Sequence, residues 1–470
     1  MTEPVQQRAP GWYRRSLVLG LVMLLSVAVV NGASWLRQSG SRPEAVAVGP
    51  SRSAPTHGEA QSGAPVSPST AAVDELLQHR SEAVIAADRA QWLATVDPGS
   101  PALVLRQAEL FDRVAGLRAA VWTYSLLAPD ATLPAATQAA LGASAFLAHV
   151  RLTYRLATGA GEIDRDQHLT LVWRGRWLVG GTDDGAQQKD LWDLGPVTVS
   201  RGSRSIVVSA RAAPLSAQRT ASEADRAAER VDAVWGAAWP RIVVIMVPGS
   251  LADMAAVLDR ASPDGLSQLA AVTTGELRTA GTGVVRGGRT TGDRVVINPV
   301  AFPGLTATGR VVVLTHEFTH VATRASAVRA PPVWVDEGFA DYVAYLGTPL
   351  TAREIAGDLL DSLQAVAALG SLPDDGAFDP AAGRIGRAYA EAWLAMHFVE
   401  GEGGPPMVVD FYRVAVGLRP LHSWPSAPPV RASLTPRTPL EHACVEVLGY
   451  VEPSFVRRWL VFVREQRAAA

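Results

Sequence analysis

The hydrophobic pattern of the chain opens with an almost unbroken apolar run over residues 17–30, preceded by Arg14 and Arg15. Aromatic residues flank the run at positions that favour the membrane interface. Counted with its flanks, the stretch is long enough to cross a bilayer. The pattern predicts a transmembrane signal anchor over residues 16–36, with residues 1–15 in the cytoplasm and the rest of the chain outside.

A cleaved signal peptide is the competing interpretation of this segment, because two arginines before a short apolar run also fit that pattern. The cut would follow Gly32 or Ala33. No Ala-x-Ala pattern stands there, and Asn31 fits a cleavage site poorly, so the uncleaved anchor is favoured. In both cases the bulk of the chain is exported.

Residues 37–72 consist mainly of Ser, Pro, Gly and Ala and contain almost no large apolar side chain. Such a composition cannot bury enough surface to order itself. We expect this segment to be a disordered tether that holds the rest of the chain away from the membrane.

Between residues 73 and 190 the apolar spacing is first helical and then strand-like. Strand patterns cover residues 150–156 and the hairpin-like stretch 169–179. Helices followed by a curved antiparallel sheet resemble the NTF2-like fold, which implies an α+β accessory domain over 73–190. The sheet cavity of such folds often binds a ligand or partner; the alternative is a spacer that positions the domain behind it.

From about residue 191 onward, a small sheet is predicted to precede a helical region. Strands are expected over 205–209 and 242–247, with a helix over 224–235 between them. A Gly-rich turn indicates a hairpin whose second strand is 294–298. The fold class of the chain is therefore α+β, with residues 191–470 as its second domain.

The net charge of the chain is only −2, and no clustered basic face is visible in the sequence. This balance argues against a nucleic-acid partner. Cys444 is the only cysteine, which excludes an intramolecular disulfide and a cysteine-ligated zinc site. We expect it to be a small buried apolar residue.

Two histidines four residues apart are the main chemical signal, in the stretch His316-Glu317-Phe318-Thr319-His320. On a helix, residues with this spacing lie on one face, so both histidines can direct ring nitrogens at one ion. Glu317 lies beside the metal, within reach of a zinc-bound water, where a general base is needed. A catalytic zinc requires a third protein ligand and an open position.

The third ligand is expected from a second helical stretch that follows the Pro331-Pro332 break. Glu337 is the best candidate, and Asp341 lies four residues further on the same face, where it can fix the tautomer of a ligand histidine. Asp336 is the rival ligand but is rotated off that face. The combined spacing predicts a site for one Zn²⁺ ion on the two histidines and Glu337.

At these residues the chain resembles the gluzincin metallopeptidases, the group of thermolysin and the M1 aminopeptidases, and the resemblance implies the same ligand set. The metzincin pattern is set aside, because Thr323 and Ser326 stand where it needs a glycine and a third histidine. The segment from Tyr389 to Phe398 is similar to the M1 segment whose leading tyrosine stabilises the oxyanion. By that resemblance Tyr389 takes this role; the alternative is a buried core aromatic.

The M1 enzymes also carry a Gly-x-Met-Glu-Asn segment before the metal helix, whose glutamate holds the free amino terminus of the substrate. Residues 283–298 contain no such glutamate, which favours cleavage at internal peptide bonds. An exposed edge strand at this hairpin could hold an extended peptide by backbone pairing; the alternative is an ordinary sheet strand.

Taken together, the sequence predicts a membrane-tethered zinc endopeptidase that faces outward and acts on a peptide or protein substrate. Glu317 is the expected general base, and Tyr389 and the metal share the oxyanion. Two alternatives stay open: an exported binding or scaffold protein with a structural or inactive zinc site, and a zinc aminopeptidase. The pattern indicates no particular oligomeric state.

Overall fold

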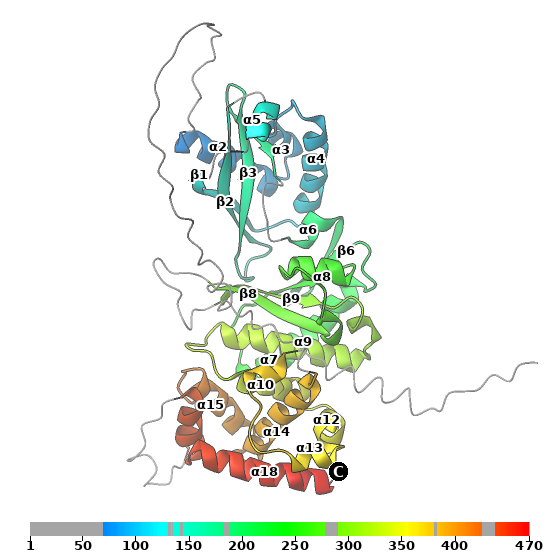
Figure 1. Ribbon diagram of the computed structural model, residues 1–470, viewed down its shortest axis with the longest axis vertical. Helices are drawn as coiled ribbons and strands as arrows, with labels where there is room; N and C mark the ends of the chain where they lie inside the picture. Colours follow the sequence, from blue (N-terminus) through cyan, green and yellow to red (C-terminus); the bar gives the residue numbers. More distant parts are fainter. Residues whose placement is uncertain are drawn as a thin grey trace, which may run out of the picture.

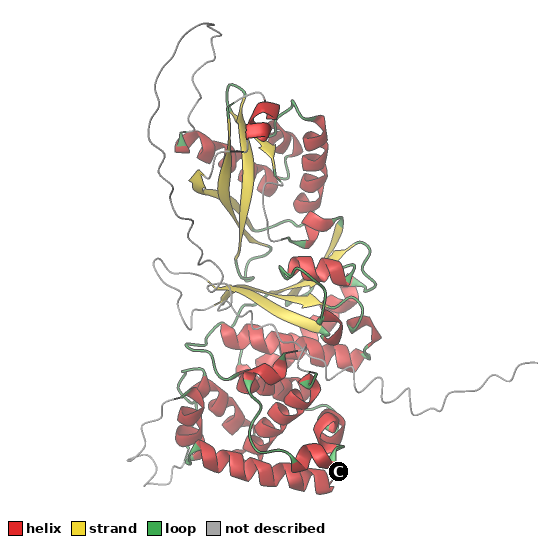
Figure 2. Ribbon diagram, viewed as in Figure 1, coloured by secondary structure: helices red, strands yellow, loops and turns green. Residues whose placement is uncertain are grey.

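The computed structural model describes residues 69–129, 133, 135–141, 144–182, 189–277, 290–379, 383–424 and 438–469. Within these residues the chain is a mixed α+β protein with two small sheets, which confirms the predicted fold class (Figure 2). The predicted anchor over residues 16–36 lies outside the described residues, as does the linker up to residue 68. None of the helices described is long and apolar enough to cross a membrane.

The described residues of the first unit form helices against a four-stranded antiparallel sheet in the order β1-β2-β3-β4 (Figure 1, blue to cyan). Its first helix begins at Thr70, inside the segment 37–72 expected as linker, because Ser69 caps it by accepting a hydrogen bond from Ala72 N at 3.3 Å. The elements are α2 (Thr70–Ala86), α3 (Arg89–Ala94), α4 (Pro101–Ala115), β1 (Val121–Pro129), α5 (Ala135–Leu141), β2 (Ala145–Arg155), β3 (Ile163–Trp173) and β4 (Trp177–Gly181).

Buried aromatic rings form the centre of this unit. Trp122 on β1 stacks on Tyr154 on β2, with ring centroids 5.6 Å apart. Trp192 contacts both rings, at 6.2 and 5.2 Å. Trp192 belongs to the short helix α6 (Leu191–Leu194), so the residues that directly follow the first unit still pack into its core.

A five-stranded sheet follows in the described chain, in the order β5-β6-β7-β9-β8 (Figure 1, green). Strands β6, β7 and β9 are parallel, and each edge strand is antiparallel to its neighbour. The strands expected over 205–209 and 242–247 and the helix between them are confirmed. The elements are β5 (Val197–Arg201), β6 (Ser205–Ala210), α7 (Ala217–Trp235), β7 (Val243–Val247), α8 (Leu251–Val257), β8 (Ala271–Leu277) and β9 (Thr290–Ile297).

The hairpin expected before the metal helix is present as β8 and β9, but its second strand is an interior strand and β8 is the edge. Strand β9 also begins earlier than expected, at Thr290. Residues 294–297 are each at most 4% exposed. Such a continuous buried run is typical of a strand that is covered on both faces of the sheet.

The rest of the described chain is helical (Figure 1, yellow to red). Helix α9 runs along the sheet below β8 and β9, and α10 and α14 lie on its far side. Cys444 is buried, as expected. The elements are α9 (Ala307–Arg324), α10 (Val333–Tyr345), α11 (Ala352–Ile355), α12 (Gly357–Leu360), α13 (Leu363–Ala367), α14 (Ile385–Gly403), α15 (Pro405–Ala415), α17 (Pro439–Ala443) and α18 (Glu452–Ala469), with single turns at Leu266–Gln268, Phe302–Gly304 and Asp375–Phe378 and a π-helical turn at Cys444–Leu448.

A buried carboxylate, Asp190, joins the two sheets. It accepts hydrogen bonds from Tyr154 on β2 at 2.9 Å and from Arg294 on β9 at 2.5 Å, and the Arg165 guanidinium on β3 lies 3.3 Å away. All four side chains belong to residues that are at most 4% exposed. Each charge depends on the others, because a buried charge without a partner is strongly unfavourable.

We predict that Asp190→Ala lowers the free energy of unfolding by about 3–5 kcal/mol, because it leaves two buried guanidinium groups without their carboxylate. The matched control is Asp112→Ala, which breaks an ion pair with Arg89 whose side chains are 60% and 51% exposed. A change of about 0–1 kcal/mol is expected there. Urea unfolding of the full-length protein, followed by tryptophan fluorescence, measures both variants. Equal shifts would show that Asp190 does not join the two sheets.

Candidate metal centre

The two histidines lie in helix α9, which is buried over most of its length. Thr306 begins this helix by accepting a hydrogen bond from Gly309 N at 3.0 Å. Residues 312–323 are each at most 2% exposed. Thr315 and Thr319 satisfy their hydroxyls on backbone oxygens four residues earlier, at 2.7 and 2.8 Å. The ionisable side chains of α9 find their partners on the neighbouring elements, since buried polar groups are as a rule hydrogen-bonded.

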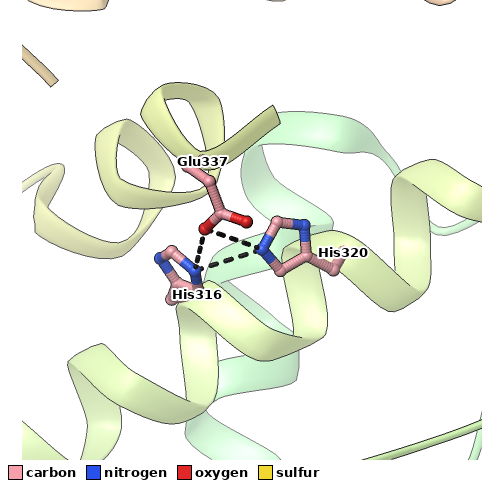
Figure 3. Close-up of side chains that lie close together, drawn as sticks. All are labelled: His316, His320 and Glu337. Carbon is pink, nitrogen blue, oxygen red and sulfur yellow. Dashed lines mark hydrogen bonds and ion pairs between the residues drawn. The ribbon is translucent and has the colours of Figure 1, made fainter. Parts of the chain in front are cut away.

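Glu337 on α10 completes a group of three with His316 and His320 (Figure 3). The two histidine Nε2 atoms are 3.1 Å apart, and Glu337 Oε2 is 3.2 Å from one and 3.5 Å from the other. Three atoms that bind one tetrahedral zinc ion at the usual bond lengths lie about 3.3 Å from one another. The group could therefore hold a metal ion, and its spacing fits an ion of that size.

The outer ring nitrogens show which atoms are available to a metal. His316 Nδ1 is 2.8 Å from Asp341 Oδ1, as expected for a carboxylate that fixes the tautomer. His320 Nδ1 is 3.4 Å from Asp336 Oδ2, at an ion-pair distance. Asp336, the rival ligand, thus contacts the outer nitrogen of a histidine and does not join the group. Since each Nδ1 faces a carboxylate, the Nε2 lone pairs of the neutral rings converge on the same point.

Burial and the neighbouring charges shift the pKa of the two histidines in opposite directions. Burial alone would lower the pKa of both imidazoles, but the neighbouring carboxylates outweigh it. Asp341 and Glu337 raise the pKa of His316 well above its usual value. Glu337 and Asp336 raise the pKa of His320 to about 9. The carboxylates around the two imidazoles therefore favour positive charge at this point of the structure.

Glu317 is buried beside the group and is held by a residue of the sheet. Its Oε2 accepts a hydrogen bond of 2.5 Å from the hydroxyl of Thr273 on β8. Its Oε1 is also buried and has no hydrogen-bond partner in the part of the chain that the structure describes. Burial raises the pKa of Glu317, and the two imidazoles act against this rise.

Tyr389 reaches the centre from α14, and a glycine on α10 makes this possible. The Tyr389 hydroxyl donates a hydrogen bond to Glu337 Oε2 at 3.1 Å. A Cβ added to Gly338 would lie 2.6 Å from the backbone oxygen of Ala392 on α14, closer than two helices can tolerate. Gly338 therefore allows α14 to approach α10, and this approach brings Tyr389 to the ligand carboxylate.

The structure brings together every residue that the sequence named for the site: His316, Glu317, His320, Glu337, Asp341 and Tyr389. Thr273 is a site residue that the sequence did not predict, because no motif surrounds it. The alternation along β8 indicates only that Thr273 and its neighbours take opposite faces, and it does not say which helix covers each face. The role of Asp336 as the outer partner of His320 was not predictable either, because that contact depends on how α10 is rotated against α9.

Comparisons with known proteins give no relative for this centre: no protein-family model matches the chain, and no curated protein matches it. The chemistry of the centre is therefore inferred from its own residues.

We predict that His320→Ala lowers the affinity for Zn²⁺ by more than the roughly 10–100-fold that the loss of an outer partner causes, because it removes one of three ligands. Asp341→Ala should cause the smaller loss, about 10–100-fold, since only the orientation of a ligand ring is freed. His397→Ala is the matched control: its imidazole on α14 is 34% exposed and bonded to Glu400, and no change is expected. Competition with a chromophoric chelator measures each affinity. Equal affinity of His320→Ala and His397→Ala would exclude the site.

Protons and the metal compete for the same Nε2 atoms, so we predict that the affinity for Zn²⁺ rises with pH until the pKa of His320, about 9, is passed. The direction follows from protonation: below its pKa the imidazole must lose a proton before it binds the ion, and above it there is none to lose. Binding at neutral pH should release about one or two protons. Calorimetry in buffers of different ionisation enthalpy counts them, and a heat that does not depend on the buffer would contradict the prediction.

Proposed function

We propose that this protein is a zinc-dependent peptidase that hydrolyses internal peptide bonds. The observation that carries the proposal is the convergence of two imidazole nitrogens and one carboxylate oxygen within 3.5 Å of one another, with the buried carboxylate of Glu317 on the same helix. Peptide hydrolysis needs an electrophile for the carbonyl, a base for the attacking water and a proton for the leaving amine. A metal on the ligand group would serve as the electrophile, and Glu317 is suited to both proton transfers.

Zinc is the metal that we infer from the donor set. Imidazoles combined with one carboxylate are a common ligand set of catalytic zinc, which keeps a fourth position open. Among the described residues the group contains three protein ligands and no fourth His, Cys, Asp or Glu, which supports an open site over a closed, structural one. When bound, zinc would polarise the carbonyl of the substrate and lower the pKa of water.

Glu317 is the proposed general base. It follows His316 directly in α9, so its carboxylate lies beside the ligand group and not within it. The rise in the pKa of Glu317 that burial causes makes the carboxylate a better proton acceptor. In the proposed reaction Glu317 takes a proton from the attacking water and later passes it to the leaving amine nitrogen.

Tyr389 is the proposed donor to the oxyanion. Its hydroxyl already lies at the ligand group, 3.1 Å from Glu337 Oε2. Burial raises the pKa of Tyr389 well above its usual value, so the phenol keeps its proton. A neutral donor that is held in place can stabilise the negative charge that develops on the carbonyl oxygen.

An extended peptide is the proposed substrate, and β8 is the strand proposed to hold it. Among the described strands, β8 pairs only with β9. Residues 271–273 of β8 are each at most 2% exposed, so the proposed pairing with a peptide begins beyond Thr273, at Thr274. The contact between Thr273 and Glu317 places this strand next to the centre. Backbone pairing does not depend on particular side chains, so we expect broad sequence preference.

The aminopeptidase alternative can be tested together with endopeptidase activity. The lack of a suitable glutamate in residues 283–298 favours internal cleavage. An aminopeptidase instead needs an acidic group near the centre that binds the free amino terminus of the substrate. Peptides with free and with acetylated amino termini distinguish the two activities.

We also propose that the second part of the chain is a peptidase domain of the gluzincin type. In support, a sheet, the metal helix α9, the ligand helix α10 and the tyrosine helix α14 follow one another in the order that the resemblance implies. The proposed location, anchored in a membrane with the centre facing outward, rests on the sequence of residues 16–36. The NTF2-like character of the first unit remains a proposal of the same kind.

We predict that Glu317→Gln binds as much zinc as the wild type but hydrolyses peptides at least about 100-fold more slowly, because the amide cannot accept the proton. The matched control is Glu354→Gln, an exposed carboxylate on α11, for which unchanged zinc content and activity are expected. Elemental analysis measures the zinc. Cleavage of an unfolded protein and of peptides with free or acetylated amino termini measures the activity of the full-length protein in detergent.

Each outcome of this experiment selects among the functions. Equal activity of the wild type and Glu317→Gln would remove Glu317 from the mechanism. Zinc without any hydrolysis by the wild type would favour the binding or scaffold alternative. Cleavage confined to peptides with a free amino terminus would assign the protein to the aminopeptidases.

A further inference from the structure

We propose that Thr273, on the edge strand β8, is a positioning residue that holds the carboxylate of Glu317 in place for proton transfer. The inference rests on the function proposed above. Thr273 lies 44 residues before Glu317 in the chain, so the two meet only when the sheet and α9 are assembled.

Thr273 faces the metal helix although it belongs to an edge strand. It is only 2% exposed, and its backbone pairs with Val295 of β9. Helix α9 runs along β8 and β9 (Figure 1). The Thr273 hydroxyl meets this helix at Glu317. The next residue, Thr274, takes the opposite face of the strand because side chains alternate.

The hydroxyl of Thr273 has two acceptors within reach, and both belong to Glu317. Oε2 of the carboxylate is 2.5 Å away and the backbone oxygen is 3.2 Å away. A hydroxyl carries one proton, so it cannot donate to both at once. The ionised carboxylate is favoured, since hydrogen bonds to charged acceptors are shorter and stronger. Threonine is branched at Cβ and has few rotamers, so the strand itself fixes the position of the donor.

This hydrogen bond makes the two carboxylate oxygens of Glu317 unequal. Oε2 is tied to β8, whereas Oε1 is buried and has no hydrogen-bond partner in the described part of the chain. A buried oxygen without a partner is unfavourable, and such positions in native proteins call for an explanation. If Oε1 of Glu317 accepts the proton of the attacking water, its lack of a partner in the described structure is explained. Thr273 then keeps Oε1 as the acceptor and stops the carboxylate from rotating out of proton-transfer distance.

Variants of the full-length protein separate positioning from a structural role. Thr273→Val keeps the branched shape and removes the donor. Thr273→Ala removes it as well and serves if the valine variant fails to fold. Thr273→Ser keeps the donor and removes the methyl group. Thr274→Val is the matched control, on the opposite face of the same strand.

For Thr273→Val and Thr273→Ala we expect kcat about 10–100-fold lower, KM within about twofold of the wild type and unchanged zinc content. The reason is that the hydroxyl contacts the base and neither the substrate nor a ligand. Thr273→Ser should keep kcat within about threefold and Thr274→Val within about twofold of the wild type. The loss should also be the same for peptides of different sequence. Unchanged kcat in the donorless variants overturns the proposal, and so does a loss confined to KM.

Crystal structures of the variants give a measurement that needs no activity. In Thr273→Val we expect the Glu317 carboxylate to leave its place at β8 or to become disordered, and in Thr273→Ser to occupy it again. A Glu317 side chain that keeps its place without the hydroxyl overturns the proposal, whatever the kinetics. If the wild type cleaves no peptide, the proposed function fails, and these structures alone decide whether Thr273 positions Glu317.

Discussion

The burial of charge between α9 and α10 is the constraint on which the centre depends. Five ionisable side chains are each at most 4% exposed: His316, Glu317, His320, Glu337 and Asp341. Buried charges persist only when they neutralise one another. The carboxylates of Glu337, Asp341 and Asp336 face the two imidazoles, so negative charge surrounds the point at which the ring nitrogens converge. The same carboxylates that raise the pKa of the histidines therefore also suit the site to a divalent ion.

The geometry of this charged group is set by apolar packing around it. Phe339, two residues after Glu337, stacks on Tyr412 of α15 with ring centroids 4.2 Å apart, and Trp235 of α7 meets Phe339 edge-on at 5.7 Å. These contacts fix the rotation of α10 about its own axis, and the rotation decides that Glu337 turns toward α9. Gly338 completes the arrangement because it admits the backbone of α14.

Helix periodicity explains how much of the site was readable from the sequence. It places His316 and His320 on one face of α9, and Glu337 and Asp341 on one face of α10. Each half of the group was therefore predictable without knowledge of the fold. How the two halves meet was not, because periodicity gives a face and not its partner. Strand order is equally invisible in a sequence, which is why β9 looked like a possible edge although β8 occupies it. The hydrogen bond between Thr273 and Glu317 depends both on the strand order and on which helix packs against the sheet.

Strand β9 connects the centre to the first unit of the chain. Arg294 donates to the buried Asp190, and the same residue pairs with Thr274 of β8, while its neighbour Val295 pairs with Thr273. A displacement of the first unit would therefore act on β8 through β9, and β8 carries the hydroxyl that contacts Glu317. Packed interiors transmit such displacements because they contain little free volume. The orientation of the first unit and the position of the carboxylate thus depend on the same strand, which makes this unit part of the framework of the centre.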